Sequence, residues 1–425
     1  MLFSNIAWML AGNVSYGFSQ WALLVALAKI GTIEMVGTLA LALAIGVPVL
    51  MFTSLSLRSL QVTDHRNSYR FLEYSTLRIL TVILSIIFIF AFGVTAGYSP
   101  ATLASIALIV AAKAVEYLSD ILYGLLQRQE HMAGIAISMI LRGALSVGSL
   151  SLGVYLTRSL VWGAAGLLLS STLVLLIYDI PKALAVAKFQ FSVVSKECIN
   201  YLNKLMTDGA HRRLWKLGMA GLPMGFVLML VSLNLNIPRY FIQRHLGMRE
   251  LAIFSAIATL MAAGSVVTNA VGQAAAPRLS KCFATRDMRG FGGLLAAVVA
   301  ATLGLGALGL GGALLFGREA MAIIYRPEYS ARQDVLVWLM AASGFFYLGS
   351  TLRYAVTAVR CFTPQLPLFA VAAPTTAIGC MALIPTYGLR GAAMAIFISA
   401  IIQCGGSAWL LYRSCRQDAA LAPSC

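Results

Sequence analysis

Residues 77–97 read LRILTVILSIIFIFAFGVTAG, and Arg78 is the single charged residue in this stretch. A run of this length and apolarity is typical of an α-helix that crosses a bilayer, which needs about 20 apolar residues. Over the whole chain of 425 residues, 60% are hydrophobic and 11% are charged. Ordinary globular domains are roughly 25% charged. The sequence therefore predicts an integral membrane protein without a separate soluble domain.

Similar apolar runs recur from one end of the chain to the other, separated by short charged or Pro/Gly-containing breaks. They predict an all-α protein with about twelve transmembrane helices. The predicted helices cover residues 6–28, 35–57, 77–97, 102–126, 133–156, 160–180, 216–243, 251–274, 291–316, 335–358, 366–385 and 391–412. The first run is too long for the core of a signal peptide and lacks a basic n-region, so we expect it to be retained.

The longest polar interruption, residues 181–215, divides the predicted helices into two blocks of six. It predicts an N-lobe over 1–180, a cytoplasmic linker over 181–215 and a C-lobe over 216–425 with a short cytoplasmic tail. Within the linker, Ile199, Leu202 and Leu205 share one helical face. This pattern fits a short helix lying on the membrane, and a solvated basic loop fits it equally well.

The two blocks contain matching patches in the same order. Gly31-Thr-Ile-Glu34 matches Gly247-Met-Arg-Glu250, and Gly163-Ala-Ala165 matches Gly391-Ala-Ala393. Recurrence at corresponding helices favours an internal duplication. With six helices in each copy, both copies enter the membrane from the same side, which makes the repeats parallel. Parallel repeats around an axis along the membrane normal are one design of secondary transporters, with the substrate site between the lobes.

The formal net charge of +16 does not call for a nucleic-acid partner, because most Lys and Arg residues lie in the even-numbered loops and at the C-terminus. Cytoplasmic loops retain such residues, so both termini are predicted to be cytoplasmic, in a bacterial inner membrane. Five cysteines fall on this predicted cytoplasmic side, where disulfides are not expected. They are Cys198, Cys282, Cys361, Cys415 and Cys425.

Several short patches are similar to those of one transporter family. They are Leu57-Arg58 with Thr63-Asp64, Gln127-Arg128-Gln-Glu130 with Leu141-Arg142-Gly143, Asn236-Ile-Pro-Arg-Tyr240 before Gly247-Met-Arg-Glu250, Ala276-Pro-Arg278, and Tyr325-Arg-Pro-Glu-Tyr329. With them the chain resembles, over nearly its whole length, the Wzx-type (O-antigen) polysaccharide flippases of the multidrug/oligosaccharidyl-lipid/polysaccharide exporter (MOP) superfamily.

The resemblance implies a MATE/MOP-like fold, two six-helix lobes around a central cavity. It implies export of an undecaprenyl-diphosphate-linked oligosaccharide repeat unit from the cytoplasmic to the periplasmic leaflet by alternating access, for O-antigen, exopolysaccharide or capsule. The implied partners are the polyprenyl-diphosphate-linked oligosaccharide, membrane lipids, a polysaccharide polymerase and a chain-length regulator.

Two other functions stay open. One is a cation-coupled multidrug or small-molecule antiporter of the same superfamily. Such antiporters usually carry a carboxylate in the first or seventh helix, and 6–28 and 216–243 contain neither Asp nor Glu. The other is a membrane polysaccharide polymerase, which the short external loops disfavour. No metal cluster, cofactor motif or nucleophile constellation occurs in the sequence, so a transporter is expected rather than an enzyme.

Charged residues inside predicted helices are costly and usually face the protein interior or a watery cavity. Lys113, Glu116 and Asp120 share one face of the fourth helix, and Arg142 on the fifth is expected to pair with Glu116 or Asp120. The cluster either lines the cavity, where it contacts the diphosphate or relays protons, or forms an ionic brace between the two helices. Its formal charges sum to zero, which favours the brace, because an anion site should carry surplus positive charge.

Three further arginines are candidates for holding the diphosphate, since a guanidinium can bond phosphate oxygens in a bidentate way. Arg353 lies on the tenth helix with no acidic residue within a turn or two. Arg239 lies at the far end of the seventh helix, and Arg58 at the cytoplasmic end of the second. The alternative roles are snorkelling to the lipid headgroups and anchoring at the membrane interface.

Amide, hydroxyl and aromatic side chains on the predicted helices are candidates for binding the sugars. They are Asn13, Tyr16, Gln20, Asn236, Asn269, Gln273, Tyr347 and Tyr354. Hydrogen bonding between helices is the alternative for the polar residues. Packing in the core is the alternative for the two tyrosines of the tenth helix.

Overall fold

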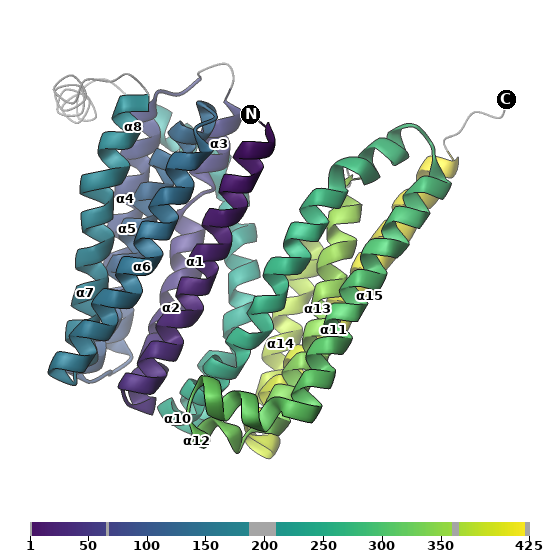
Figure 1. The fold of residues 1–425 in the computed structure, drawn as a ribbon. Helices are drawn as coiled ribbons and strands as arrows, with labels where there is room; N and C mark the ends of the chain where they lie inside the picture. Colours follow the sequence, from purple (N-terminus) through teal and green to yellow (C-terminus); the bar gives the residue numbers. More distant parts are fainter. Residues whose placement is uncertain (1, 65–67, 187–209, 359–364, 421–425) are drawn as a thin grey trace. The chain divides into compact units, whose positions relative to one another are not determined.

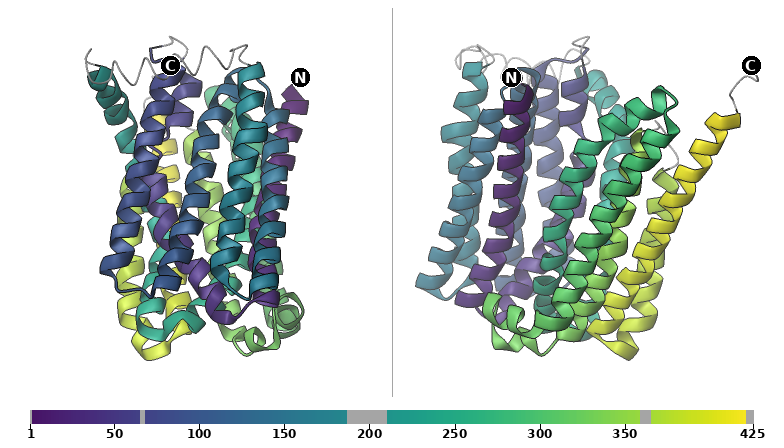
Figure 2. Two further views of the ribbon diagram at one scale, coloured as in Figure 1. Left: turned by 90° about the vertical axis from the view of Figure 1, so that its left-hand side faces the viewer. Right: turned by 45° about the vertical axis from the view of Figure 1, so that its right-hand side comes forward.

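A computed structural model describes residues 2–64, 68–186, 210–358 and 365–420, and every element in these ranges is helical. Figures 1 and 2 show the helices. Their bounds are α1 (Leu2–Ile30), α2 (Ile33–Thr53), α3 (Leu57–Thr63), α4 (Phe71–Thr95), α5 (Pro100–Arg128), α6 (Met132–Thr157), α7 (Leu160–Leu173), the π-helix η1 (Val174–Asp179), α8 (Ile180–Val186), α10 (Ala210–Ala284), α11 (Met288–Ile324), α12 (Pro327–Ser330), α13 (Gln333–Ala358), α14 (Gln365–Tyr387) and α15 (Leu389–Ala420).

Ten helical segments in the described ranges are long and apolar enough to cross a membrane. One of them covers 62 residues, 211–272. At 1.5 Å per residue this is about 93 Å, enough for two crossings. Its backbone breaks at Gly247, with φ 86° and ψ −177°, between the predicted seventh and eighth helices. The predicted first helix is present as α1. Its polar side chains lower its mean hydropathy below that of the ten membrane-spanning segments. The all-α membrane fold is confirmed.

The chain forms two compact units, Met1–Ser232 and Leu233–Cys425, and the boundary falls inside α10. The beginning of α10 belongs to the first unit because its apolar residues pack there. Leu217 joins a buried cluster with Leu55 and Tyr74, and the ring of Phe226 lies 5.0 Å from that of Phe52. Most of the predicted linker 181–215 lies outside the described residues, and the predicted lobe boundaries stay a prediction.

In the first unit, whose helices are drawn in Figure 1, small residues allow the long helices to approach each other closely. A Cβ added at Gly12 of α1 would lie 2.8 Å from the Ala136 Cα of α6, and one at Gly166 of α7 would lie 2.8 Å from the Ser149 carbonyl oxygen of α6. Membrane helices rely on such close backbone contacts because lipid provides no hydrophobic drive for helix association. The short α3 lies at the end of the unit where the chain begins.

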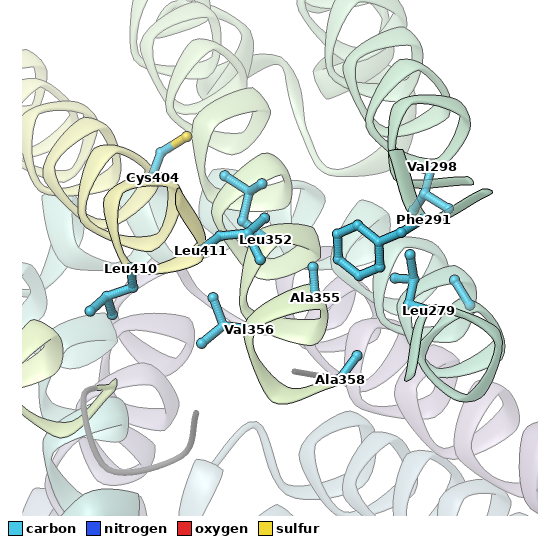
Figure 3. Close-up of a cluster of buried hydrophobic side chains, with 11 residues drawn as sticks. Leu279, Phe291, Val298, Leu352, Ala355, Val356, Ala358, Cys404, Leu410 and Leu411 are labelled. Atoms are coloured by element: carbon cyan, nitrogen blue, oxygen red, sulfur yellow. The ribbon is translucent and has the colours of Figure 1, made fainter. Parts of the chain in front are cut away.

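The second unit has its own apolar core, formed by α10, α11, α13 and α15 (Figure 3). Its members are Ala275, Leu279, Phe291, Val298, Leu352, Ala355, Val356, Ala358, Cys404, Leu410 and Leu411. Within this unit, α12 and the turn between α14 and α15 lie at the end opposite the last turns of α15 (Figure 1). This arrangement places the loops of the second unit at two separate ends.

Candidate functional site

Asp120 of α5 lies between two arginines of other helices. Its Oδ1 is 3.2 Å from Nη1 of Arg58 on α3, and its Oδ2 is 3.3 Å from Nη2 of Arg78 on α4. Arg78 is buried, whereas the side chains of Arg58 and Asp120 are 25% and 30% exposed. One carboxylate therefore serves two guanidinium groups. This cluster, Arg58, Arg78 and Asp120, carries a formal surplus of one positive charge and is open to the surface beside Arg58.

A sharp turn after α2 brings Arg58 over α5. Leu55 and Ser56 both have left-handed φ values, 50° and 49°, a strained conformation for residues with a Cβ. Gly124 of α5 then allows α3 to approach, because the amide of Gln61 occupies the place where a Cβ would lie. The sequence gives no direct signal for this turn, since neither Leu nor Ser is typical of left-handed backbone.

Further contacts orient the two guanidinium groups. Arg58 Nε donates to Gln127 Oε1 at 3.0 Å, and Arg58 lies over the Tyr123 ring, 5.6 Å from its centroid. Arg78 lies over the Tyr117 ring at 5.8 Å. Aromatic faces attract cations, most strongly where water is excluded. The arginines are thus held in place by α5, which supplies both aromatic rings, the carboxylate and the amide.

Asp64 organises the segment between α3 and α4. Its carboxylate accepts hydrogen bonds from the backbone N–H of Ser68 at 3.0 Å and of Tyr69 at 3.1 Å, and from the Tyr74 hydroxyl at 3.3 Å. Partial burial opposes ionisation, but these hydrogen bonds outweigh it and hold the pKa of Asp64 below its ordinary value. A charged Asp64 therefore supports the end of the helix that carries Arg58.

Arg142 pairs with a residue that was not among the predicted partners. Its Nη2 lies 2.7 Å from Asp179 Oδ2 and 2.6 Å from Ser119 Oγ. The prediction of Glu116 or Asp120 as its partner is wrong. Asp179 is the last residue of the π-helix η1, and the wider π turn changes the helical face on which it lies. Sequence spacing that assumes regular α-helices misses this pairing.

Lys113 and Glu116 form a second polar cluster with α1. Lys113 Nζ donates to Glu116 Oε1 at 3.1 Å, to the Tyr16 hydroxyl at 3.0 Å and to Gln20 Oε1 at 2.9 Å. Tyr16 in turn donates to Glu116. Beside this cluster is a cavity of about 20 Å³ that Ser146 also lines, room for one water molecule. The predicted sugar ligands Tyr16 and Gln20 are therefore part of an ionic network.

Two other predicted polar ligands, Asn13 and Asn269, form hydrogen bonds within the protein. Asn13 is exposed, and its amide donates to the Met9 carbonyl of its own helix at 2.7 Å. Asn269 accepts from the Ser350 hydroxyl at 3.2 Å. The side chain of Gln273 lies outside the described residues. The binding of sugar by these three residues stays a prediction.

The tyrosines of α13 pack against glycines of α10. Tyr347 is buried and its hydroxyl donates to the Met261 carbonyl at 2.5 Å. A Cβ at Gly264 or Gly272 would overlap Tyr347 or Tyr354, respectively. In this structure both rings fill space left by glycine, which is the packing role given above as the alternative to sugar stacking.

The two predicted arginines of the second unit lie in different surroundings. Arg239 Nη1 donates to Asn236 Oδ1 at 2.7 Å, and among the described residues no carboxylate forms an ion pair with Arg239. Arg353 lies over the Phe346 ring, 5.9 Å from its centroid. Both residues stay candidates for an anion.

Two residues of these networks, Arg78 and Asp179, are absent from the sites predicted from sequence. Each is an isolated charge in or at the end of an apolar run. An ionisable residue within a membrane helix is a signal for function or for a specific partner. Arg78 is the second residue of the run 77–97, close to its polar end, a position where an arginine is also typical of a membrane interface.

Comparison with known proteins gives a family. The sequence profile of the family described as "Polysaccharide biosynthesis protein" matches residues 2–283. A curated relative, "Capsular polysaccharide biosynthesis protein CapF" of Staphylococcus aureus, is 25% identical over 404 residues, which cover 94% of this chain and 96% of the relative.

Solved structures share the fold. An inward-facing multidrug resistance MATE family transporter of the MOP superfamily matches with a TM-score of 0.72 and 13% identity, over 97% of this chain and 96% of that one. The lipid II flippase MurJ, in an inward closed conformation, matches with a TM-score of 0.68 and 17% identity, over 96% and 87%. The fold is therefore that of MOP-superfamily transporters, and the chain belongs to the Polysaccharide biosynthesis protein family.

Proposed function

We propose that this chain is a flippase that moves a polyprenyl-diphosphate-linked oligosaccharide repeat unit from the cytoplasmic to the outer leaflet of the inner membrane. The family, the CapF relative and the transporter fold support this proposal. Undecaprenyl diphosphate is the proposed carrier, and alternating access of the N-lobe and C-lobe is the proposed mechanism. Both termini are proposed to be cytoplasmic, with a polymerase and a chain-length regulator acting next.

The surplus positive charge of the Arg58, Arg78 and Asp120 cluster supports a role of these residues in binding the diphosphate. A diphosphate offers several charged oxygens, and arginine can bond two of them at once. Arg58 uses Nε and Nη1 for Gln127 and Asp120, and among the described residues nothing accepts from its Nη2. The cluster lies at the predicted cytoplasmic end, where the lipid-linked substrate is made. We assign Arg58 as the first contact of the diphosphate.

The test is deletion of the gene, followed by measurement of lipid-linked repeat units in the inner membrane. The proposal expects these units to accumulate on the cytoplasmic face and surface polysaccharide to fall. Complementation with the wild-type chain restores both, and complementation with Arg58→Ala does not. Unchanged levels of lipid-linked units in the deletion strain, together with altered drug or cation efflux, would overturn the proposal.

Cation-coupled antiport is the second candidate, and the Lys113 and Glu116 cluster favours it. A carboxylate that lies beside a water-sized cavity within the membrane helices is suited to proton exchange. The adjacent Lys113 argues against antiport, because its positive charge neutralises the negative charge of Glu116. The same deletion strain separates the two functions, because an antiporter alters efflux without changing the pool of lipid-linked oligosaccharide.

A further inference from the structure

Two neighbouring cavities lie at one end of the second unit. One, of about 470 Å³, is lined by residues of α10, by Arg332 just before α13 and by residues around the α14–α15 turn. The other, of about 560 Å³, is lined by residues of α11, α13, α14 and α15. Tyr387 and Arg390 line both. The two cavities therefore form one groove, which we name the turn groove. Its combined size suits a ligand of several rings, since single ligand pockets are about 300–1,000 Å³.

The turn groove lies on the predicted external side. Its lining comes from the segments around Gly247, Gln333 and Gly388, which join odd-numbered helices to the next even-numbered helix. The α14–α15 turn, which carries part of this lining, lies at the end of the unit opposite the last turns of α15 (Figure 1). Gly388 has a φ of 59°, which allows the tight turn that presents Tyr387 and Arg390 next to each other.

The charges of the turn groove are paired across helices. Arg390 Nε of α15 donates to Asp334 of α13, and Arg332 Nη2 donates to Glu250 Oε1 of α10 at 3.0 Å. The formal charges of these four residues cancel, so the groove does not favour an anion such as phosphate. Such paired groups present donors and acceptors at fixed spacing. A neutral ligand with many hydroxyl groups can use both kinds at once.

The turn groove also has aromatic faces and an oriented amide. Tyr387 is 56% exposed, and Trp338 is held by an edge contact with Phe397, with 5.6 Å between ring centroids. Gln333 Nε2 donates to the Ala313 carbonyl at 3.0 Å and the Leu314 carbonyl at 3.1 Å, which leaves its carbonyl oxygen as an acceptor. Aromatic rings with polar tips bind amphipathic ligands well.

We infer that the turn groove is a saccharide-binding site, which takes the sugar portion of the repeat unit on the external side. Paired charges and aromatic faces without surplus charge match neutral pyranose rings, which have hydroxyl edges and apolar C–H faces. A role only as an interfacial aromatic anchor accounts for Tyr387 and Trp338 but not for the paired Asp334 and Glu250. The inference rests on the proposed function for the identity of its cargo and for its orientation.

The test uses the full chain in lipid nanodiscs and, as probe, the oligosaccharide released by mild acid from the host's own lipid-linked repeat units. Binding is measured by titration calorimetry or by saturation-transfer NMR. Tyr387→Ala and Asp334→Asn are each expected to weaken binding by about tenfold, the effect of losing one good contact. Tyr387→Phe keeps the ring and is expected to bind as the wild type does.

Tyr155→Ala is the matched control, because Tyr155 is also an exposed tyrosine beside an arginine, Arg158, at the predicted external end of the first unit. It is expected to leave binding unchanged. Unfolding temperatures of all variants verify that the folds are intact. Absence of binding by the wild type, or equal losses in Tyr155→Ala and Tyr387→Ala, overturns the inference. The deletion strain separates this inference from the proposed function. If the binding test fails but lipid-linked units accumulate in the deletion strain, only the saccharide site in the turn groove is excluded and the proposed function stands.

Discussion

Arg142 Nη2 of α6 lies 2.7 Å from Asp179 Oδ2 of η1, and their side chains are 3% and 1% exposed. A buried pair of this kind holds two helices together, because breaking it leaves a charge without compensation. The same Asp179 accepts from Ser138, which also bonds Tyr123. Three helical segments, α5, α6 and η1, are therefore joined through one carboxylate.

Removing one member of this pair is expected to destabilise the protein strongly. Arg142→Met or Asp179→Asn should each lower stability by about 3–5 kcal/mol, whereas the double variant should lose less than the sum. Unfolding temperature and protein abundance in the membrane are the measurements. If the losses of the two single variants simply add in the double variant, the two residues do not form the brace described here.

Loss of Arg58, the partly exposed arginine beside Asp120, is expected to reduce transport more than stability. Arg58→Ala should lower the export of lipid-linked repeat units by about tenfold, as expected for one charged hydrogen-bonding group, and Arg58→Lys should recover part of it. The measurement is surface polysaccharide at equal protein levels. Arg128→Ala is the matched control, because Arg128 is an exposed arginine at the same end of α5. Equal export defects in the two variants would contradict the assignment.

The ion pair between Arg213 and Glu73 attaches the start of α10 to the start of α4. Arg213 Nε lies 2.7 Å from Glu73 Oε1, and the Glu73 side chain is buried whereas that of Arg213 is half exposed. Arg213→Ala should cost about 1–3 kcal/mol, because it leaves a buried carboxylate with fewer donors. Arg212→Ala, which changes an adjacent exposed arginine, should be nearly neutral. Thermal unfolding in detergent distinguishes the two variants, and similar shifts would contradict this role.

A methyl group at Gly264 is expected to disturb the contact between α10 and α13. It would overlap the Tyr347 ring, so Gly264→Ala should destabilise the second unit by about 1–3 kcal/mol. At Gly304 of α11 the same methyl group meets open space, and Gly304→Ala should be neutral or stabilising. Unfolding temperatures of the purified variants provide the comparison. A stable Gly264→Ala protein would show that Tyr347 moves away at low cost.

Acid is expected to loosen the segment between α3 and α4. The pKa of Asp64 in the folded chain lies below its ordinary value. Its hydrogen bonds therefore stabilise the fold above the ordinary carboxyl pKa, and this contribution is lost as pH falls through the lowered value. Stability profiles of the wild type and Asp64→Asn should converge at low pH and separate near neutral pH. Parallel profiles over the whole range would exclude this role for Asp64.

The membrane fold could be predicted from sequence because apolar length is a local property. Runs such as 77–97 specify helices by themselves, since a bilayer requires every backbone group to be bonded within the helix. The break between the seventh and eighth helices was equally visible, because Gly247 and the charges around it interrupt an apolar pattern. The family could also be predicted from patches such as Asn236-Ile-Pro-Arg-Tyr240.

Partners across helices were decided only by tertiary structure. The sequence shows that Arg142 needs an anion, but the choice of Asp179 over Glu116 or Asp120 depends on a π turn and on helix packing. Likewise, Arg78 reaches Asp120 because α4 packs beside α5. The hydropathy of a run determines that a helix crosses the membrane, whereas its rotation about its own axis depends on every neighbour that it contacts, and that rotation decides which charges meet.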